Sequence, residues 1–352
     1  MPYGLLRVLA GLALLGLGAA SGLAFLARYH WRLELLTHGR AHYLVISAAM
    51  AAAFLLARRV RLAAAAAMVA LVNATVVFPS FAAARIEAGE VAGSQRLRLA
   101  MLNVYWKNRH FEPTLGWLRQ PSPDVAVIIE ITQAWESQAD SLRDLFPFRV
   151  SVPEGWGNGL AILSRHPITA ERVLWPFGGR PAIVVRLEVS ARPVTLIGVH
   201  PDAPSRWGTA SRDRHLRNLG RTVADLPRPL VVAGDFNTTP WSYAFTDFVR
   251  ATELRPTFIG PTWPAGLARF GIPIDHLLTS PDLPVASLIR GPAFGSDHAP
   301  ILAEMLLTAP AVVRGPSGPP PPALPALVFH CDGYPEPRRS ESRYSRRSPA
   351  CR

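Results

Sequence analysis

Val231-Val232-Ala233-Gly234-Asp235-Phe236-Asn237 and, later in the chain, Gly295-Ser296-Asp297-His298-Ala299-Pro300 are the two stretches that decide the fold. Each places an acid beside a second polar residue, next to an apolar run of strand length. Strands that end in this way present short, rigid side chains at one rim of a sheet. A hydrolase needs such a rim to hold a divalent metal, a phosphate and a water in line. The two stretches therefore predict a site built from strand ends.

Composition separates the start of the chain from the rest. The protein has 352 residues, 49% of them hydrophobic, and the apolar excess lies in roughly the first eighty residues. The net charge is +12, with Lys107 as the single lysine, and this balance suits nucleic acid, anionic lipid or polyphosphate partners without selecting one. The two cysteines, Cys331 and Cys351, stand outside any Cys/His cluster with zinc spacing, so a structural zinc is not expected.

Three apolar segments predict a membrane region over residues 1–84. Residues 5–26 and 62–84 are long enough to cross a bilayer, which takes about twenty apolar residues, whereas 41–56 is short. A cleaved signal peptide has a shorter core and would not be followed by two more apolar runs. The alternative interpretation is a buried helical hairpin. We expect about three transmembrane helices and a multi-pass protein of the inner or plasma membrane.

Arginine placement predicts the orientation of these helices. Arg58-Arg59-Val60-Arg61 joins the second and third segments, and a cytoplasmic position for this link places Arg7 and the amino terminus in the cytoplasm too. The remainder of the chain then emerges outside the cytoplasm. The first link opposes this orientation in part, because it carries several arginines, namely Arg28, Arg32 and Arg40.

The rest of the chain predicts a layered α/β domain between a linker and a tail. Residues 85–96 are polar and indicate the linker, and residues 97–307 alternate short apolar runs with helical patterns, which favours sheets covered by helices. Expected strands are 98–104, 125–129, 159–163, 182–189, 194–199 and 230–233, and expected helices are 114–119, 136–146 and 211–226. Residues 308–352 are rich in proline and arginine and are expected to be disordered.

The ordered set of polar residues in this domain resembles the endonuclease/exonuclease/phosphatase superfamily. The matching positions run through the domain in the order Asn103, Glu130, Asn158 to Pro167, His200, Gly234 to Asn237, Ile274 to His276 and Ser296 to His298. The superfamily includes deoxyribonucleases, apurinic-site endonucleases, sphingomyelinases and inositol-polyphosphate phosphatases. The resemblance implies a four-layered α/β sandwich of two packed sheets flanked by helices. The preceding apolar segments are similar to a bacterial membrane-anchored subgroup that includes teicoplanin-resistance membrane proteins.

Three residues are expected to bind a metal ion. Glu130 ends an apolar run with no basic neighbour, which suits a hard, oxygen-seeking cation such as Mg²⁺. The resemblance implies that Glu130 is the main metal ligand, that Asn103 lies close to it, and that Asp297 lies near the metal or the attacking water. Mn²⁺ is the alternative metal. The alternative interpretation of Glu130 is a solvated strand end.

Five residues are expected to act on the phosphate. Asp235 and Asn237 lie two apart after a strand, so an extended chain would turn both to one side, although a Gly-Asp turn with an Asx cap is the simpler interpretation. The resemblance implies water activation and phosphate contact at these two positions. It also implies that His298 contacts the phosphate with Asp275 as the partner of its second nitrogen. His200 is expected to contact the phosphate, or else to be an ordinary buried histidine. Asn158 is expected to line the substrate cleft, and His276 to point away from it.

These expectations define a membrane-anchored, Mg²⁺-dependent phosphodiesterase or phosphatase that uses direct attack by water. Lipid-linked phosphate outside the cytoplasm is the favoured substrate class. The first alternative is a nuclease acting on DNA outside the cytoplasm, for which Trp106, Lys107, Arg109 and Trp207 could line a groove. The second alternative is a non-catalytic membrane protein for binding or resistance. No protein partner is identifiable from the sequence.

Overall fold

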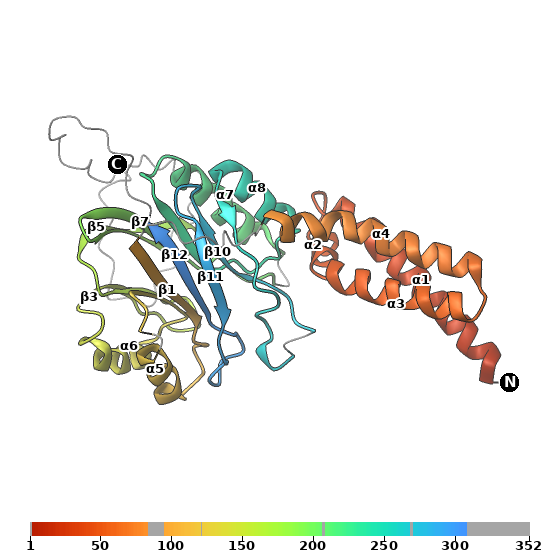
Figure 1. Cartoon of the computed structure of the whole chain (residues 1–352), viewed down its shortest axis with the longest axis horizontal. Coiled ribbons are helices and arrows are strands. Elements are labelled where there is room, and N and C mark those ends of the chain that lie inside the picture. Colours follow the sequence, from red (N-terminus) through yellow and green to blue (C-terminus); the bar gives the residue numbers. More distant parts are fainter. Residues whose placement is uncertain (1, 84–94, 121, 206–207, 268–269, 308–352) are drawn as a thin grey trace, which may run out of the picture.

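The computed structural model describes residues 2–83, 95–120, 122–205, 208–267 and 270–307. A helical bundle formed by the first of these segments projects from a layered α/β domain formed by the others (Figure 1). The first strand begins at Gln95, two residues inside the segment expected as linker. The rest of that linker, the expected tail with its two cysteines, and Trp207 lie outside the described residues. The exact division into domains stays a prediction.

The α/β domain contains two mixed sheets of six strands each. The first sheet has, in spatial order, β11 (Val285–Arg290), β12 (Ile301–Leu307), β1 (Gln95–Asn103), β2 (Val125–Ile129), β4 (Leu160–Ser164) and β3 (Phe148–Val152). The second sheet has β5 (Ile168–Phe177), β6 (Arg180–Val189), β7 (Arg192–Val199), β8 (Leu230–Asp235), β10 (Asp275–Thr279) and β9 (Arg255–Pro256).

One parallel pair lies at the centre of each sheet. β1 runs parallel to β2, and β7 runs parallel to β8, whereas the other neighbours are antiparallel. All five residues of β2 and all six of β8 are buried, because apolar layers cover both faces of each sheet. The parallel pairs bring the carboxyl ends of four strands to the same edge of the sandwich, and the polar residues that follow those strands gather there.

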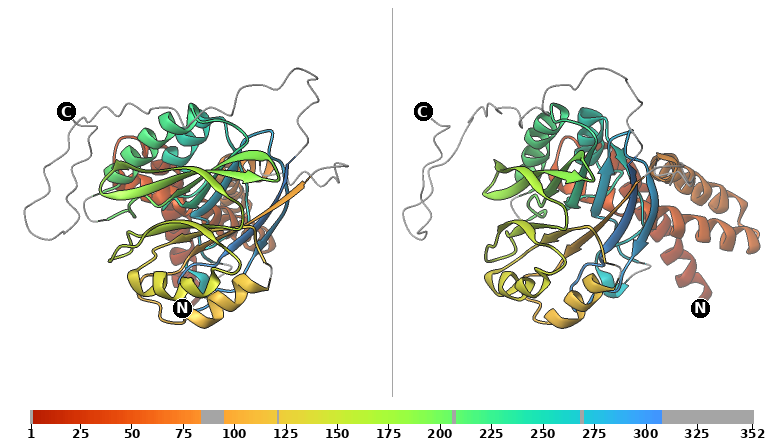
Figure 2. Two further views of the ribbon diagram at one scale, coloured as in Figure 1. Left: turned by 90° about the vertical axis from the view of Figure 1, so that its left-hand side faces the viewer. Right: turned by 60° about the vertical axis from the view of Figure 1, so that its left-hand side comes forward.

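Three apolar layers hold the sandwich together. Figure 2 shows the two sheets lying between the helices that cover their outer faces. The inner faces of the two sheets pack on one another through residues such as Met101 and Leu196. The outer face of the first sheet is covered by α5 (Phe111–Arg119) and α6 (Gln133–Ala139), and that of the second by α7 (Ala210–Ala224) and α8 (Tyr243–Thr252). Fully burying one such apolar side chain contributes roughly 1.5–3 kcal/mol. The predicted four-layered α/β sandwich is confirmed.

The helix expected over residues 136–146 is wrong in its bounds. α6 starts at Gln133, where the Thr132 hydroxyl accepts a hydrogen bond from the backbone N–H of Trp135, and it ends at Ala139. A 3-10 turn, η2 (Asp140–Leu142), follows directly. The Asp140 carboxylate binds Arg149 at the start of the next strand, so the chain leaves the helix early.

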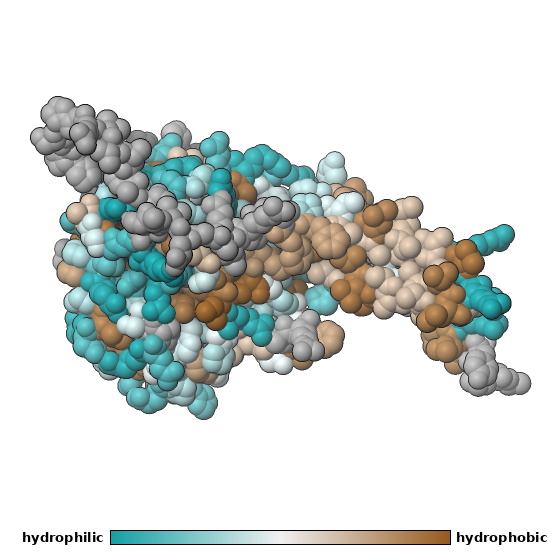
Figure 3. Space-filling model, viewed as in Figure 1, coloured by the Kyte–Doolittle hydropathy of each residue, from teal (hydrophilic) through white to brown (hydrophobic). Residues whose placement is uncertain are grey.

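The bundle contains α1 (Pro2–Leu23), the 3-10 turn η1 (Ala24–Leu26), α2 (Trp31–His38), α3 (Arg40–Leu56) and α4 (Val60–Ala83). Two helical segments, Gly4–Leu26 and Val60–Phe81, are long and apolar enough to cross a membrane. α2 and α3 together form a third candidate, bent by 57° at their junction. Figure 3 shows the apolar surface of the projecting bundle beside the more hydrophilic α/β domain. The bundle thus supplies two or three candidate transmembrane helices.

The near end of the bundle is bonded to the α/β domain. Arg28 makes two hydrogen bonds of 2.8 Å to the Asp247 carboxylate on α8. On α2, which the sequence analysis did not predict, Glu34 lies 3.0 Å from the Arg212 guanidinium of α7, and both side chains are buried. On α3, Nε2 of His42 lies 2.8 Å from the Phe270 carbonyl oxygen. The bundle is therefore seated on α7, α8 and the loop at Phe270.

Candidate active site

The polar residues that follow the central strands meet at one edge of the sandwich. Asn103 ends β1, Glu130 follows β2, His200 follows β7, and Asp235 ends β8. Because each of these strands belongs to a parallel pair, their carboxyl ends share that edge. β10 runs antiparallel to β8, and its first residue, Asp275, is paired with Asp235 in the register. The fold alone thus places acids from both sheets together.

Asn103 links the acids of the two sheets. Its Nδ2 donates to Glu130 Oε1 at 3.2 Å and to Asp235 Oδ2 at 3.2 Å. The second oxygen of Glu130 accepts the backbone N–H of Trp106 at 3.0 Å. Glu130 has φ of +63°, a left-handed conformation that costs about 1 kcal/mol or more in a residue with a side chain. This backbone turn at the end of β2 places the carboxylate at the rim of the site.

Two buried histidines face Asp235. Nε2 of His298 lies 3.6 Å from Asp235 Oδ2, and Nε2 of His200 lies 3.7 Å from the same oxygen. The other ring nitrogen of His298, Nδ1, is 2.8 Å from Asp275 Oδ2. His200 also approaches Glu130, with Nε2 3.9 Å from Oε1. The structure therefore brings together five of the predicted residues around the buried Asp235 carboxylate.

Burial and charge set opposite protonation states for the two histidines. Burial opposes charge on His298, but Asp275 and Asp235 outweigh it and raise its pKa to about 10. Burial lowers the pKa of His200 well below its usual range, and Arg180 adds to this effect. At neutral pH His298 is an imidazolium and His200 is a neutral ring.

The pKa values of two acids in the site are shifted as well. Burial raises the pKa of Asp235 to about 7, against the opposing effect of the neighbouring His298, while Asp275 raises it further. Burial likewise raises the pKa of Glu130, and Asp297 adds to the increase. A buried carboxylate with a pKa near neutrality can exchange a proton at physiological pH, as a general base does.

Arg180 fixes the tautomer of His200, and the sequence analysis missed it. Its Nη1 lies 2.9 Å from His200 Nδ1 and donates there, so the ring hydrogen of His200 is on Nε2, which faces the acids. Its Nε donates to Asp202 Oδ1 at 2.6 Å, and Nη1 also donates to the Gly157 carbonyl at 2.7 Å. β6 and β7 form a hairpin that pairs Ala182 with Val199. This register, rather than any motif, is the signal that places Arg180 beside His200.

Asn237 lies beyond the end of β8, so the expectation that it and Asp235 project from one extended strand is wrong. Its φ of +51° turns the chain, and its backbone N–H donates to Asp235 Oδ1 at 2.8 Å, which is an Asx turn. Its side-chain amide donates to the Pro201 carbonyl at 3.0 Å, beside His200. The turn thereby fixes one oxygen of Asp235 and leaves the other facing the histidines.

The remaining predicted residues lie around this centre. Asp297 is half-buried and accepts the indole N–H of Trp263 at 3.1 Å. Asn158 is half-buried in the loop before β4, next to Gly157, whose added Cβ would lie 3.2 Å from the Glu130 carboxylate. His276 points to the other side of β10, where Nε2 contacts the Thr238 carbonyl at 2.7 Å.

The acids at this edge fit a divalent cation. Glu130, Asp235 and Asp297 share a region in which burial and mutual repulsion raise the pKa of two of them, and a cation would relieve both effects. Asp235, Asp275 and His298 also lie close enough to hold an ion. The last two already bond to each other at 2.8 Å, so the Glu130 carboxylate is the better candidate for a metal ligand.

Comparisons with known proteins agree with this architecture. Residues 102–298 match the Endonuclease/Exonuclease/phosphatase family. The structure is similar to an endonuclease/exonuclease/phosphatase from Beutenbergia cavernae, with 19% identity, a TM-score of 0.50, and coverage of 60% of this chain and 71% of that one. It is similar to D. rerio TDP2 complexed with single strand DNA product, with 14% identity, a TM-score of 0.50, and coverage of 60% and 99%.

A third similar structure is the human Nocturnin catalytic domain with bound sulfate anion, at 18% identity, a TM-score of 0.49, and coverage of 60% and 97%. No curated protein sequence matches the chain. The family match spans more than half of the chain and contains the whole acid and histidine cluster, from Asn103 to His298. The chain belongs to the endonuclease/exonuclease/phosphatase family.

Proposed function

We propose that this protein is a membrane-anchored, metal-dependent phosphoester hydrolase that acts on lipid-linked phosphate outside the cytoplasm. The observation that carries the hydrolase part is that Nε2 of His298 and Nε2 of His200 lie 3.6 and 3.7 Å from the same buried oxygen of Asp235. This arrangement combines a base of near-neutral pKa with one charged and one neutral hydrogen-bond donor, as direct attack by water on a phosphoester requires.

Asp235 is the group that orients and deprotonates the water. The backbone N–H of Asn237 fixes its Oδ1, so Oδ2 is the oxygen that faces the histidines and the reacting phosphate. His298 donates from Nε2 to a non-bridging oxygen as negative charge builds up, and Asp275 keeps the ring charged. His200, whose Nδ1 accepts from Arg180, donates its Nε2 hydrogen to a second oxygen.

The other residues hold the substrate and the metal. The amides of Asn237 and Asn158 contact the phosphate without adding charge. Mg²⁺, with Mn²⁺ as the alternative, would be held by Glu130, Asn103 and Asp297, and when bound it neutralises phosphate charge and stabilises the leaving oxygen. Water attacks directly in this proposal, and no covalent enzyme intermediate forms.

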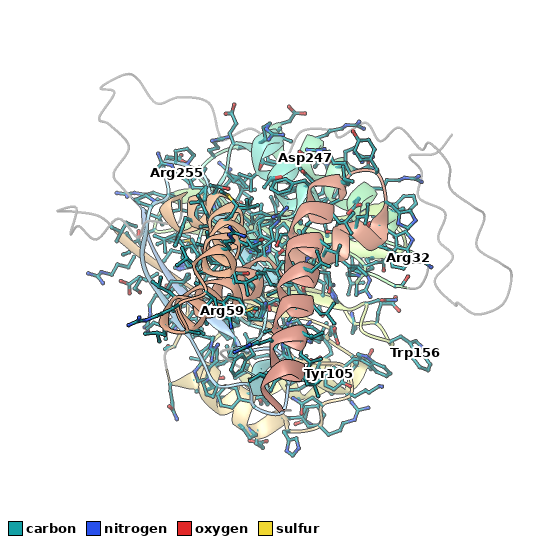
Figure 4. All side chains as sticks on the ribbon, turned by 90° about the vertical axis from the view of Figure 1, so that its right-hand side faces the viewer. Arg32, Arg59, Tyr105, Trp156, Asp247 and Arg255 are labelled. Atoms are coloured by element: carbon teal, nitrogen blue, oxygen red, sulfur yellow. The ribbon has the colours of Figure 1, made fainter. Side chains whose placement is uncertain are left out.

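The position of the bundle supports a lipid substrate. The bundle contacts loops that surround the acids: His38 Nδ1 lies 3.0 Å from the Thr239 hydroxyl, and His42 contacts the Phe270 carbonyl. Two large aromatic side chains at this edge are exposed, Trp156 at 80% and Phe270 at 74%. Viewed along the bundle, Tyr105 and Trp156 lie on the same side of it (Figure 4). Exposed aromatic residues beside transmembrane helices suit contact with a membrane surface.

The arginines support an orientation with the α/β domain outside the cytoplasm. The amino terminus and the turn between α3 and α4 lie at the far end of the bundle (Figure 1), so Arg58, Arg59 and Arg61 lie on the opposite side of the membrane from the domain. Arg28, which opposed this orientation in the sequence, forms an ion pair with Asp247. A charge neutralised within the protein counts less toward orientation than the exposed arginines of the far turn.

A nuclease is the second candidate function. Lys107 Nζ lies 4.8 Å from the centroid of the Trp106 ring, and that ring is 5.3 Å from the ring of Trp156. A cation beside two neighbouring aromatic rings suits single-stranded nucleic acid. D. rerio TDP2, which has a similar fold, is complexed with single strand DNA product. The resemblance to teicoplanin-resistance membrane proteins stays a prediction. A non-catalytic role in binding or resistance is the third candidate function.

The test compares substrates on the full-length protein in detergent micelles, with Mg²⁺ and with EDTA. Phospholipid, polyprenyl pyrophosphate and plasmid DNA are supplied separately, and Asp235→Asn is the inactive reference. We expect turnover of a lipid phosphate at least about a hundredfold above that of DNA. Trp156→Ala should raise KM for the lipid but not for a soluble nitrophenyl phosphodiester, whereas Trp175→Ala, at a sheet edge, should change neither. Faster turnover of DNA would favour the nuclease, and no turnover at all would favour the non-catalytic protein.

A further inference from the structure

A cavity lies between the bundle and the α/β domain. Its volume is about 350 Å³, which is within the range of sites for small ligands. The bundle contributes Phe25, Arg40 and Val76 to its walls, and the α/β domain contributes Trp241 and Phe258. None of the acids and histidines of the candidate active site lines it. The cavity is therefore a separate feature, located where the near ends of the transmembrane helices meet the domain.

Arg40 brings an uncompensated charge to this cavity. It is only 2% exposed, and no described residue places a carboxylate within ion-pair distance of it. Its Nη1 reaches the neutral amide oxygen of Asn73 at 3.4 Å, and its guanidinium carbon lies 4.3 Å from the centroid of the Phe25 ring. Its Nε has no hydrogen-bond partner among the described residues. Other arginines at the junction differ, because Arg28 and Arg212 are each paired with an acid.

Trp241 adds a second free donor. It is 6% exposed, and its buried indole N–H has no hydrogen-bond partner in the part of the chain that the structure describes. Arginine and tryptophan side chains only donate hydrogen bonds, so a ligand that satisfies both must accept them. Leaving a buried charge and a buried N–H unsatisfied is costly, so a ligand that accepts from both would stabilise this junction.

The remaining walls restrict the ligand further. Phe25, Val76 and Phe258 give the cavity an apolar lining that a free inorganic anion could not fill. The cavity is lined by residues at the near ends of α3 and α4, and the membrane anchoring proposed above would put it near the level of the lipid headgroups. We propose that it binds an anionic glycerophospholipid, with the headgroup phosphate on Arg40 and Trp241 and the start of an acyl chain against the apolar wall.

The position of Trp241 also assigns a role to this lipid. Trp241 follows Thr239 and Pro240, in the segment that leads away from the candidate active site, and the Thr239 hydroxyl contacts His38 of the bundle. A lipid that bridges Arg40 of the bundle and Trp241 of the domain holds the two parts together. It is a bound structural lipid and not a substrate, because the described residues that line the cavity include no acid or histidine that could activate water.

The test measures lipid retention by native mass spectrometry on the full-length protein in detergent, titrated with phosphatidylglycerol or phosphatidylcholine. We expect one tightly held phosphatidylglycerol, bound at least about tenfold more strongly than phosphatidylcholine. Arg40→Gln should weaken binding by about tenfold or more, and Trp241→Phe, which removes only the N–H, by about threefold. Arg59→Gln, at the exposed far turn, is the matched control and should leave this affinity unchanged.

Several results would overturn the proposal. Equal retention of both lipids, or unchanged retention by Arg40→Gln, would show that the buried arginine does not bind a headgroup. Displacement of the lipid by inorganic phosphate alone would identify a site for free anions instead. If Arg40→Gln fails to fold, Trp241→Phe decides the question. Hydrolysis of a soluble phosphodiester serves as the folding control, so a failed lipid site is distinguishable from a failed active site.

Discussion

Replacing Asp275 by asparagine tests how the charge on His298 is maintained. Asp275 Oδ2 lies 2.8 Å from His298 Nδ1, and both side chains are buried. Asparagine keeps an oxygen acceptor at this position and removes the negative charge. The substitution therefore preserves the orientation of the ring while it weakens the preference for the imidazolium.

The expected size of the effect follows from the pKa of His298. Burial works against the charged ring, yet Asp275 and Asp235 together raise the pKa from 6.5 to about 10. The difference of roughly 3.5 pH units corresponds to about 5 kcal/mol in favour of the charged form. Asp275 contributes the larger share of the attraction, so its loss should lower the pKa by about 2 pH units, to roughly 8.

The assay is kcat for a soluble nitrophenyl phosphodiester between pH 6 and pH 11 with saturating Mg²⁺. In the unaltered protein the alkaline limb should lie near pH 10, and in Asp275→Asn near pH 8. At pH 9 the variant should be about tenfold slower, while at pH 6, where the ring is charged in both proteins, the difference should be small. Asp225→Asn, at the exposed end of α7, is the control. An alkaline limb that stays in place in Asp275→Asn would refute the assigned role of His298.

Three further predictions concern the neighbouring groups. Arg180→Met should leave the tautomer of His200 unfixed and let the pKa of His200 rise. We expect the acid limb of the rate profile to move to higher pH and kcat to fall by roughly tenfold, with partial recovery in Arg180→Lys. An unchanged acid limb and an unchanged kcat would contradict this prediction. Glu130→Gln should weaken Mg²⁺ binding in calorimetric titration by at least about tenfold. Thermal stability should not fall, because burial already disfavours the charged form of Glu130. An unaltered Mg²⁺ affinity would exclude Glu130 as a ligand. Burial lowers the pKa of His215 from 6.5 to about 4, so between these pH values the unfolded chain binds a proton that the folded protein does not. The stabilisation from the neutral ring is therefore full above pH 6.5, and up to roughly 3 kcal/mol of it is lost as the pH falls to 4. Thermal unfolding of His215→Gln should show a smaller loss of stability over this range, and an equal loss would contradict the prediction.

The sequence predicted the centre of the molecule better than its edges. Buried strands such as Val125–Ile129 are continuous apolar runs. The acid or amide that follows each of these runs marks the polar edge of the sandwich. β5, by contrast, is half-buried at a sheet edge with an irregular register against β6, so it has no clear apolar pattern. α2 was missed because it carries Glu34, whose burial depends on Arg212 far along the chain.

The site shows the same division. Asp235 and His298 stand in short motifs that can be recognised in the sequence, whereas Arg180 acts only through the hairpin register that places it beside His200. Asn237 was expected in an extended chain, but its left-handed φ turns it out of the strand. Sequence patterns report which residues end a strand, and they do not report the backbone turn that follows.

Phosphodiester hydrolysis by Asp235→Asn is the measurement that tests the account most directly. The full-length protein and the variant are compared on a soluble nitrophenyl phosphodiester at pH 8, with Mg²⁺ and with EDTA, after circular dichroism has shown equal folding. We expect the unaltered protein to be active only with the metal, and the variant to lose at least about a thousandfold in kcat because it has no base for water. Activity of the variant equal to that of the unaltered protein would contradict the claim that these converging side chains form a hydrolytic site.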